Sequence, residues 1–188
     1  KVAQADMVRN IIPEGVECIF VRQAEQLGLG HAVLCAERAV DGHPFAVLLA
    51  DDFLTDYEPG VTADLAHAFM NTGKSQLSIM EIDGPDISKY GVVVPSKDGV
   101  GVQGLIEKPN FEDSPSKLAS IGRYVLSPDI FRVLRQLPAG LGDEIQLADA
   151  INKQAKEGLV EIVPLKGRRF DCGSVEGFID AIVHASGR

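Results

Sequence analysis

Residues 45–54 read F-A-V-L-L-A-D-D-F-L, an apolar run that ends in two adjacent carboxylates, Asp51 and Asp52. A short continuous apolar run is typical of a strand that is buried on both faces of a parallel sheet. An acid at the carboxyl end of such a strand lies where open α/β sheets bind ligands, and a carboxylate there can hold Mg²⁺, which usually accompanies phosphates. Because aspartates after strands also form turns and helix caps, the position alone leaves both interpretations open.

The pattern around this run predicts a single domain over residues 1–188. Before Asp83, expected strands at 16–21, 45–50 and 76–81 alternate with expected helices at 31–40 and 61–72, which indicates a parallel α/β sheet with right-handed crossovers. After Asp83, two strands flank a hairpin-like turn at 96–99. The further elements that we expect are strands at 90–95, 102–107, within 119–126 and at 159–165, a helix at 127–137 with Ser127 as its N-cap, a helix within 143–158 and a helix at 174–186.

Composition and charge disfavour several classes of protein. The 188 residues carry a formal net charge of −9, which argues against a general nucleic-acid-binding surface. The longest apolar runs are too short to cross a bilayer. The cysteines Cys18, Cys35 and Cys172 have no metal-ligand spacing, so we expect free thiols in a reducing compartment. The sequence therefore predicts a cytoplasmic protein that binds neither nucleic acid nor membranes.

Gln23 precedes the stretch Gly28-Leu29-Gly30-His31-Ala32, at an expected strand-to-helix turn. Two glycines at such a turn let a ligand approach the backbone closely. The dinucleotide fingerprint needs another glycine where this chain has Val33, so the stretch is not a convincing NAD loop. A plain turn that starts a helix remains the alternative.

Charged residues also follow two later strands. Glu107 and Lys108 stand before Pro109, where a carboxylate can accept hydrogen bonds from sugar hydroxyls and an ammonium can neutralise a phosphate. Solvated charges at the end of an edge strand would look the same. Asp171 stands two residues before Gly173, either as a second metal ligand facing Asp51 or as part of a turn. The positive cluster at 166–169 lies either near phosphates or on a solvated turn, and the acids within 142–147 are interpreted as structural or interfacial.

Each of these signals is weak alone, but their order along the chain closely resembles that of the bacterial UTP–glucose-1-phosphate uridylyltransferases, a branch of the sugar nucleotidylyltransferases. The resemblance covers nearly the whole chain. It implies a Rossmann-like α/β fold, with a mixed, mostly parallel sheet, flanking helices and a small β-hairpin subregion that binds the sugar. The elements that carry it are Gln23 with 28–32, L-A-D at 49–51, K-Y-G-V-V at 89–93, E-K-P at 107–109, I-G-R-Y-V-L at 121–126, G-D-E-I-Q-L at 142–147 and D-C-G at 171–173.

The resemblance also implies a reaction and a role for each matching residue. UTP and glucose 1-phosphate would give UDP-glucose and pyrophosphate with Mg²⁺, in a homo-oligomer. No protein nucleophile is needed, so catalysis would rest on positioning and charge neutralisation. By this resemblance Gln23 and Gly28 recognise uracil, Asp51 and Asp171 bind the metal, Gly91, Glu107 and Gly122 contact the sugar, Lys108 binds the sugar phosphate, and Asp52 has a supporting role.

One departure from the family pattern is large. The family begins with a glycine-rich G-x-G-T-R loop that grips the nucleotide phosphates, and these 188 residues contain no such loop. We therefore expect an N-terminally incomplete domain, equivalent to the last two-thirds of the family domain, with little transferase activity on its own. Two alternatives stay open: a non-catalytic module that binds UDP-sugars or mediates assembly, and a metal-dependent glycosyltransferase.

Overall fold

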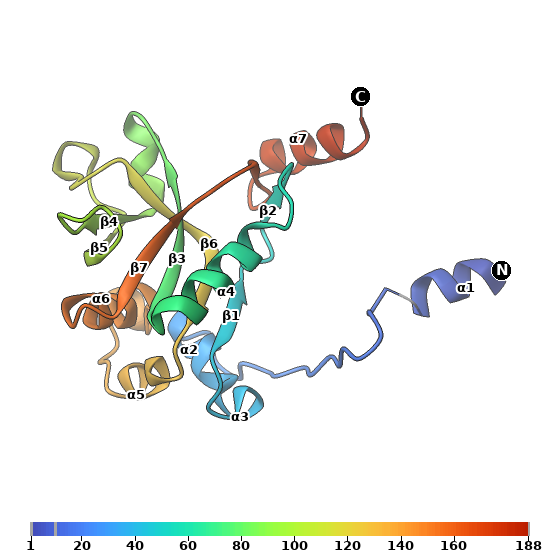
Figure 1. Ribbon diagram of the computed structural model, residues 1–188, viewed down its shortest axis with the longest axis horizontal. Helices are drawn as coiled ribbons and strands as arrows, with labels where there is room; N and C mark the ends of the chain where they lie inside the picture. The colour runs from blue at the N-terminus through green and yellow to red at the C-terminus, as the bar shows by residue number, and fades with distance from the viewer. Residues whose placement is uncertain (1, 10, 188) are drawn as a thin grey trace.

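The computed structural model describes residues 2–9 and 11–187, and it confirms the α/β class (Figure 1). In this part of the chain, the main sheet has the order β5-β4-β6-β3-β7, with β1 paired to β6 beside that path. A separate antiparallel pair, which the sequence did not predict, joins β2 (Asp52–Thr55) to β8 (Arg168–Asp171). The strands of the main sheet are β1 (Phe45–Leu48), β3 (Ser75–Glu81), β4 (Gly91–Pro95), β5 (Val102–Glu107), β6 (Leu118–Leu126) and β7 (Val160–Pro164).

The sheet is mixed, as expected, but its hydrogen-bonded pairs are not mostly parallel. Strands β1, β3 and β4 all pair antiparallel with β6, so they run in one direction and β6 runs against them. The parallel pair among the described strands is β3 with β7. Chain order alone suggested parallel neighbours, but the chain returns from β3 to β6 through the antiparallel β4–β5 hairpin and not through a helical crossover.

Strand β1 confirms the expected position of a strand but not its expected burial. Phe45 and Val47 are partly buried, whereas Ala46 and Leu48 are exposed, Leu48 to 55%. Among the described strands, β1 pairs with β6 alone. The strand is therefore half-buried, because burial on both faces depends on neighbouring elements that an apolar run does not reveal.

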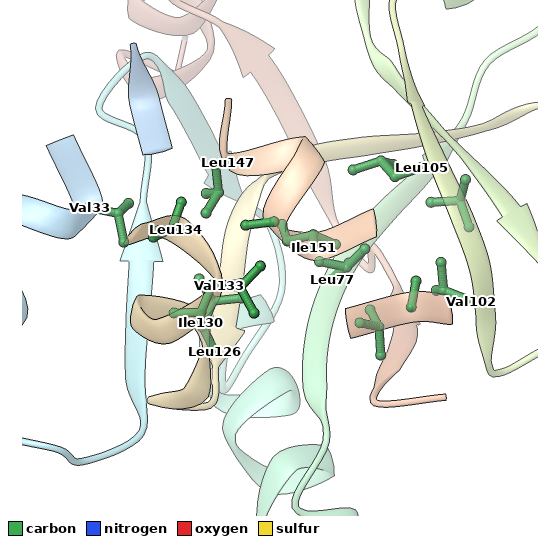
Figure 2. Close-up of a cluster of buried hydrophobic side chains, with 14 of the residues drawn as sticks. Val33, Leu77, Val102, Leu105, Leu126, Ile130, Val133, Leu134, Leu147 and Ile151 are labelled. Atoms are coloured by element: carbon green, nitrogen blue, oxygen red, sulfur yellow. The ribbon is translucent and has the colours of Figure 1, made fainter. Parts of the chain in front are cut away.

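Helices cover both faces of the main sheet. Helix α4 (Val61–Thr72) has the predicted bounds and packs Leu65 against Val125 on one face. On the other face, α2 (Leu29–Cys35), α5 (Asp129–Arg135) and α6 (Leu147–Lys156) surround the apolar core shown in Figure 2. The remaining helices are α1 (Val2–Arg9), α3 (Glu37–Val40), α7 (Val175–Ala185) and the short 3-10 helices η1 (Pro85–Lys89), η2 (Phe111–Asp113) and η3 (Leu141–Asp143).

Two local predictions were wrong. Residues 16–21 form an extended segment and not a strand, and Figure 1 shows this segment leading away from the sheet toward α1. Phe20 is 95% exposed there, and no described strand lies beside it to share backbone hydrogen bonds. Ser127 does not cap α5: Pro128 is the N-cap, and the Ser127 backbone N–H donates to Ser75 Oγ over 3.1 Å.

Among the described residues, no helix is long and apolar enough to cross a membrane.

Candidate functional site

The candidate site lies at a gap in the main sheet, between the parts of β6 that pair with β1 and with β4. Strand β3 pairs along one edge of β6, while β1 and β4 pair with different parts of the other edge, at 123–126 and at 119–120. The Leu49 N–H donates to the Gly122 carbonyl over 2.9 Å, and the chain then turns away into β2. A cavity of about 310 Å³ opens at this gap, and its lining includes six residues singled out from the sequence: Asp51, Gly91, Glu107, Lys108, Gly122 and Asp171.

The carboxylates of Asp51 and Asp171 flank the same small residue at one end of the cavity. A Cβ atom added to Gly173 would lie 3.1 Å from Asp51 Oδ2 and 3.1 Å from Asp171 Oδ1. The pairing of β2 with β8 brings the two segments together, and the Cys172 N–H donates to the Asp51 carbonyl over 2.7 Å. Two carboxylates are suitable ligands for a hard divalent cation that keeps water or phosphate oxygens in its other positions. Within the described residues, no group of three or more acidic, histidine or cysteine side chains forms a complete metal cage.

Asp52 differs from Asp51 in being buried, with 5% of its surface exposed. Its Oδ2 accepts a hydrogen bond of 2.5 Å from the Gly122 N–H, and its Oδ1 pairs with the Arg169 guanidinium. A Cβ on Gly122 would collide with Asp52 and lie 2.7 Å from Leu49 Cβ, so this position requires glycine. Asp52 thus links β2 to β6 through its hydrogen bond with Gly122, in keeping with the supporting role expected for it.

Arg169 lines the cavity, and sequence reasoning missed it as a site residue. Its Nη1 donates to the Tyr90 hydroxyl over 2.9 Å, and its guanidinium carbon lies 5.1 Å from the centre of the Tyr90 ring. Burial on its own would lower the pKa of Arg169, but the charge of Asp52 and the contacts with Tyr90 outweigh burial and raise it. The positive cluster at 166–169 was the feature of the sequence that could have indicated Arg169. The structure separates the members of this cluster: Arg169 lines the cavity, whereas Lys166 pairs with Asp64 over 2.9 Å.

Two further cavity residues, Gly91 and Glu107, lie in register across the β4–β5 hairpin. Gly91 pairs with Glu107, and a Cβ on Gly91 would lie 3.1 Å from Glu107 Oε2. Lys108 has a left-handed backbone with φ 46°, a conformation that non-glycine residues seldom adopt outside functional or strained positions. Its N–H donates to the Tyr90 carbonyl over 3.0 Å, and its Nζ lies 3.8 Å from Glu107 Oε1. Because the Lys108 side chain is 65% exposed, its ammonium is free to meet a ligand.

Gln23 and Gly28 lie together but are not among the residues that line the cavity; the neighbouring Leu29 is. The Gln23 amide nitrogen, as assigned, lies 3.1 Å from the Gly28 carbonyl oxygen and 3.0 Å from His31 Nδ1. The turn packs against 144–146, where the Gly30 N–H donates to the Ile145 carbonyl over 2.8 Å. The acids within 142–147 therefore belong to a segment that supports this turn, as the structural interpretation proposed.

Comparison with known proteins supports the resemblance seen in the sequence. A family model described as Nucleotidyl transferase matches residues 3–186. The UTP–glucose-1-phosphate uridylyltransferase of Pseudomonas aeruginosa is 43% identical over 171 residues, covering 88% of this chain and 61% of that protein. The enzyme of the same name from Escherichia coli strain K12 is 40% identical over 188 residues, covering 95% of this chain and 62% of that protein.

Solved structures give the same result. A UDP-glucose pyrophosphorylase complexed with UDP-glucose has a TM-score of 0.85 at 41% identity, covering 90% of this chain and 66% of that one. A UTP-bound enzyme from Acinetobacter baumannii has a TM-score of 0.87 at 34% identity, covering 98% of this chain and 65% of that one. The chain thus spans less than two thirds of the length of these curated relatives and structures.

Proposed function

Because the chain belongs to the nucleotidyl transferase family, we propose that the protein takes part in uridylyl transfer from UTP to glucose 1-phosphate, giving UDP-glucose and pyrophosphate. The observation that carries this proposal is that one cavity is lined both by a carboxylate pair, Asp51 and Asp171, and by the Glu107–Lys108 segment. A metal-and-triphosphate site next to a sugar-phosphate site is what this reaction requires.

We assign the metal to the end of the cavity beside Gly173. Asp51 and Asp171 would hold Mg²⁺ there, since both are carboxylates on either side of that glycine. When bound, the cation neutralises negative charge that builds up on the triphosphate. The two carboxylates fix its place relative to β2 and β8, and hence relative to the attacking group.

The other end of the cavity suits the sugar phosphate. Glu107 accepts hydrogen bonds from sugar hydroxyls, and the absence of a side chain at Gly91 leaves room for the Glu107 carboxylate to lie against β4. Lys108 places a positive charge where the sugar phosphate must approach a second anion. Gly122 lets β6 form the cavity wall without a side chain. The sugar phosphate oxygen attacks the α-phosphorus in line, and pyrophosphate leaves.

Uracil recognition falls to the turn that leads into α2. Gln23 offers an amide and Gly28 a close backbone approach next to Leu29, which lines the cavity. We further propose that residues 1–188 act as one nucleotidyltransferase domain in a cytoplasmic homo-oligomer whose ligands are UTP, glucose 1-phosphate and UDP-glucose, with no nucleic-acid or membrane partner.

Calorimetric titration with UDP-glucose and Mg²⁺ tests this function. Loss of a charge-assisted hydrogen bond of about 1.5–3 kcal/mol predicts roughly 10- to 100-fold weaker binding for Lys108→Ala. Asp51→Ala should weaken the Mg²⁺-dependent part of the affinity. Lys97→Ala, an exposed lysine in the turn between β4 and β5, is the matched control and should bind as the wild type does. Unchanged binding by Lys108→Ala would remove its phosphate role.

Turnover should be measured beside binding, as pyrophosphate release from UTP and glucose 1-phosphate. We expect these 188 residues to bind UDP-glucose but to turn over little, because they contain no G-x-G-T-R loop. Full turnover by this chain alone would refute that expectation while supporting the proposed reaction.

A further inference from the structure

The wall of the cavity contains a buried hydroxyl group that lacks a hydrogen-bond partner among the described residues. Ser120 lines the cavity and is 8% exposed. Within the part of the chain that the structure describes, its Oγ has no hydrogen-bond partner. Buried hydroxyls are nearly always paired, because leaving one unpaired costs free energy. Because the Oγ itself is buried from solvent, a partner in the cavity reaches it once the Ser120 side chain turns about its Cα–Cβ bond.

The position of Ser120 indicates what kind of partner this is. Gly91 on β4 pairs with Ser120 on β6 and, on its other side, with Glu107 on β5. These three residues form a row across the sheet, and the row has no side chain at its centre. With neighbouring strands about 4.8 Å apart, Glu107 and Ser120 stand roughly 10 Å apart on either side of this notch. A carboxylate and a hydroxyl across such a notch suit a ring that carries several hydroxyl groups.

Tyr124 is a protein group that could compete for the Ser120 hydroxyl. It lines the same cavity four residues further along β6. Burial raises the pKa of Tyr124 to about 12, and the nearby Ser120 side chain acts in the opposite direction. The cause of that opposite effect is an interaction between the two side chains, although no described residue meets Ser120 Oγ at full hydrogen-bond distance and angle.

We propose that Ser120 forms a hydrogen bond with a hydroxyl group of the sugar bound in the Gly91 notch, opposite Glu107, and so contributes to sugar selection. This inference rests on the proposed function, since the notch holds a sugar only if the cavity binds a sugar nucleotide or sugar phosphate.

The chain supplies a closely matched control in Ser78. Its Oγ is also buried and unpaired among the described residues, with 0% exposure. It lies on the opposite face of the sheet, since it pairs with Val163, which packs near α4, and it does not line the cavity. Ser78→Ala and Ser120→Ala therefore remove the same atoms from similar burial and differ in access to the ligand.

The test is titration of UDP-glucose and of UDP into wild type, Ser120→Ala and Ser78→Ala, each with Mg²⁺, together with thermal unfolding of the free proteins. A lost neutral hydrogen bond predicts that Ser120→Ala binds UDP-glucose between about twofold and tenfold more weakly. Binding of UDP, which lacks the glucosyl group, should be unchanged, and Ser78→Ala should bind both ligands as the wild type does. The Tm of free Ser120→Ala should be equal to or above that of the wild type, because alanine removes an unsatisfied hydroxyl.

Three results would overturn the proposal, and they are distinguishable. If the wild type does not bind UDP-glucose, the proposed function fails and the Ser120 proposal fails with it. If the wild type binds, Ser120→Ala binds equally well and its Tm is not lowered, the Ser120 contact alone fails. If Ser120→Ala lowers the Tm of the free protein and leaves affinity unchanged, Ser120 is paired within the protein, with Tyr124 as a candidate.

A series of UDP-deoxyglucoses then identifies the sugar hydroxyl. The analogue that lacks the bonded hydroxyl should bind the wild type more weakly but bind Ser120→Ala with no further loss. If every analogue lost the same factor with both proteins, no single hydroxyl would be coupled to Ser120 and the proposal would be wrong.

Discussion

Asp52 on β2 and Arg169 on β8 form a buried ion pair, and both side chains also bind to the wall of the cavity. The side chains are 6% and 9% exposed, and Asp52 also accepts the Gly122 N–H on β6. Arg169 reaches on to the Tyr90 hydroxyl, and the Tyr90 carbonyl in turn accepts the Lys108 N–H. One ion pair thus links the segments that carry Asp51 and Asp171 to the segment that carries Lys108.

We expect Arg169→Met to destabilise the protein by about 3–5 kcal/mol, because it leaves the Asp52 carboxylate buried and unpaired. Arg169→Lys keeps the charge but not the planar fork, so its loss should be smaller. Urea denaturation gives both values. Lys117→Ala, which breaks the exposed Lys117–Asp83 pair, is the control and should leave the urea midpoint unchanged. Wild-type stability in Arg169→Met would show that the pair does not hold the site together.

Gly122→Ala should destabilise the protein by about 1–3 kcal/mol, as overpacking in a dense interior does. The added methyl would collide with Asp52 and with Leu49, the residue at which the chain leaves β1. Gly140→Ala is the matched control: its φ is −98° and the nearest atom to its added Cβ lies 3.5 Å away. Equal urea midpoints for the two variants would contradict this account of β6.

Glu161 should contribute stability that is present at neutral pH and lost in acid. Burial on its own would raise the pKa of Glu161, but hydrogen bonds from Gln76 and Lys74 outweigh burial and hold the pKa below its ordinary value of 4.5. A carboxyl whose pKa is lowered in the folded state stabilises that state above its unfolded value and loses the effect as the pH falls through the folded value. The stability difference between wild type and Glu161→Gln should therefore be full near neutral pH and shrink below about pH 4.5.

Urea denaturation at a series of pH values measures that difference. Glu157→Gln, which changes an exposed carboxylate after α6, provides the control. A gap between wild type and Glu161→Gln that stays constant down to the lowest pH would show that these hydrogen bonds do not favour the ionised form.

Removal of the carboxylate pair should be visible in metal binding. Asp171→Asn and Asp51→Asn each remove one of the two charges beside Gly173, so we expect Mg²⁺ to raise the affinity for UTP less in either variant than in the wild type. Asp180→Asn, on the exposed surface of α7, is the control. An undiminished Mg²⁺ effect in both site variants would place the metal elsewhere.

His31 should influence base selectivity through Gln23. The Gln23 amide nitrogen faces both the Gly28 carbonyl and His31 Nδ1, so the amide oxygen points away from these two groups and can accept a hydrogen bond from a ligand. Uracil offers an N–H at N3, whereas cytosine has an acceptor there. His31→Ala should free the amide to rotate and reduce the preference for UTP over CTP by up to about tenfold, the value of one hydrogen bond. His67→Ala, which changes an exposed residue of α4, should leave the preference for UTP over CTP unchanged. If neither variant changed the ratio of UTP to CTP affinity, His31 would have no role in base selectivity.

Sequence alone determined the elements whose signal is local. Helix α4 and strand β5 have the predicted bounds, because an amphipathic period and a strand before Pro109 depend on neighbours along the chain. The segments around Asp51, Glu107 and Asp171 were also identifiable, because each combines an acid with a strand end or a turn.

Tertiary structure alone decided the direction of β6, the pairing of β2 with β8 and the lack of a strand at 16–21. Strand pairing depends on hydrogen bonds between segments far apart in the chain, which no local pattern specifies. The same holds for Arg169 and Ser120: one is recognised by its burial beside Asp52, the other by the lack of a partner in the cavity wall. Burial and hydrogen-bond satisfaction are properties of a residue's surroundings in space, so they exist only once the chain has folded.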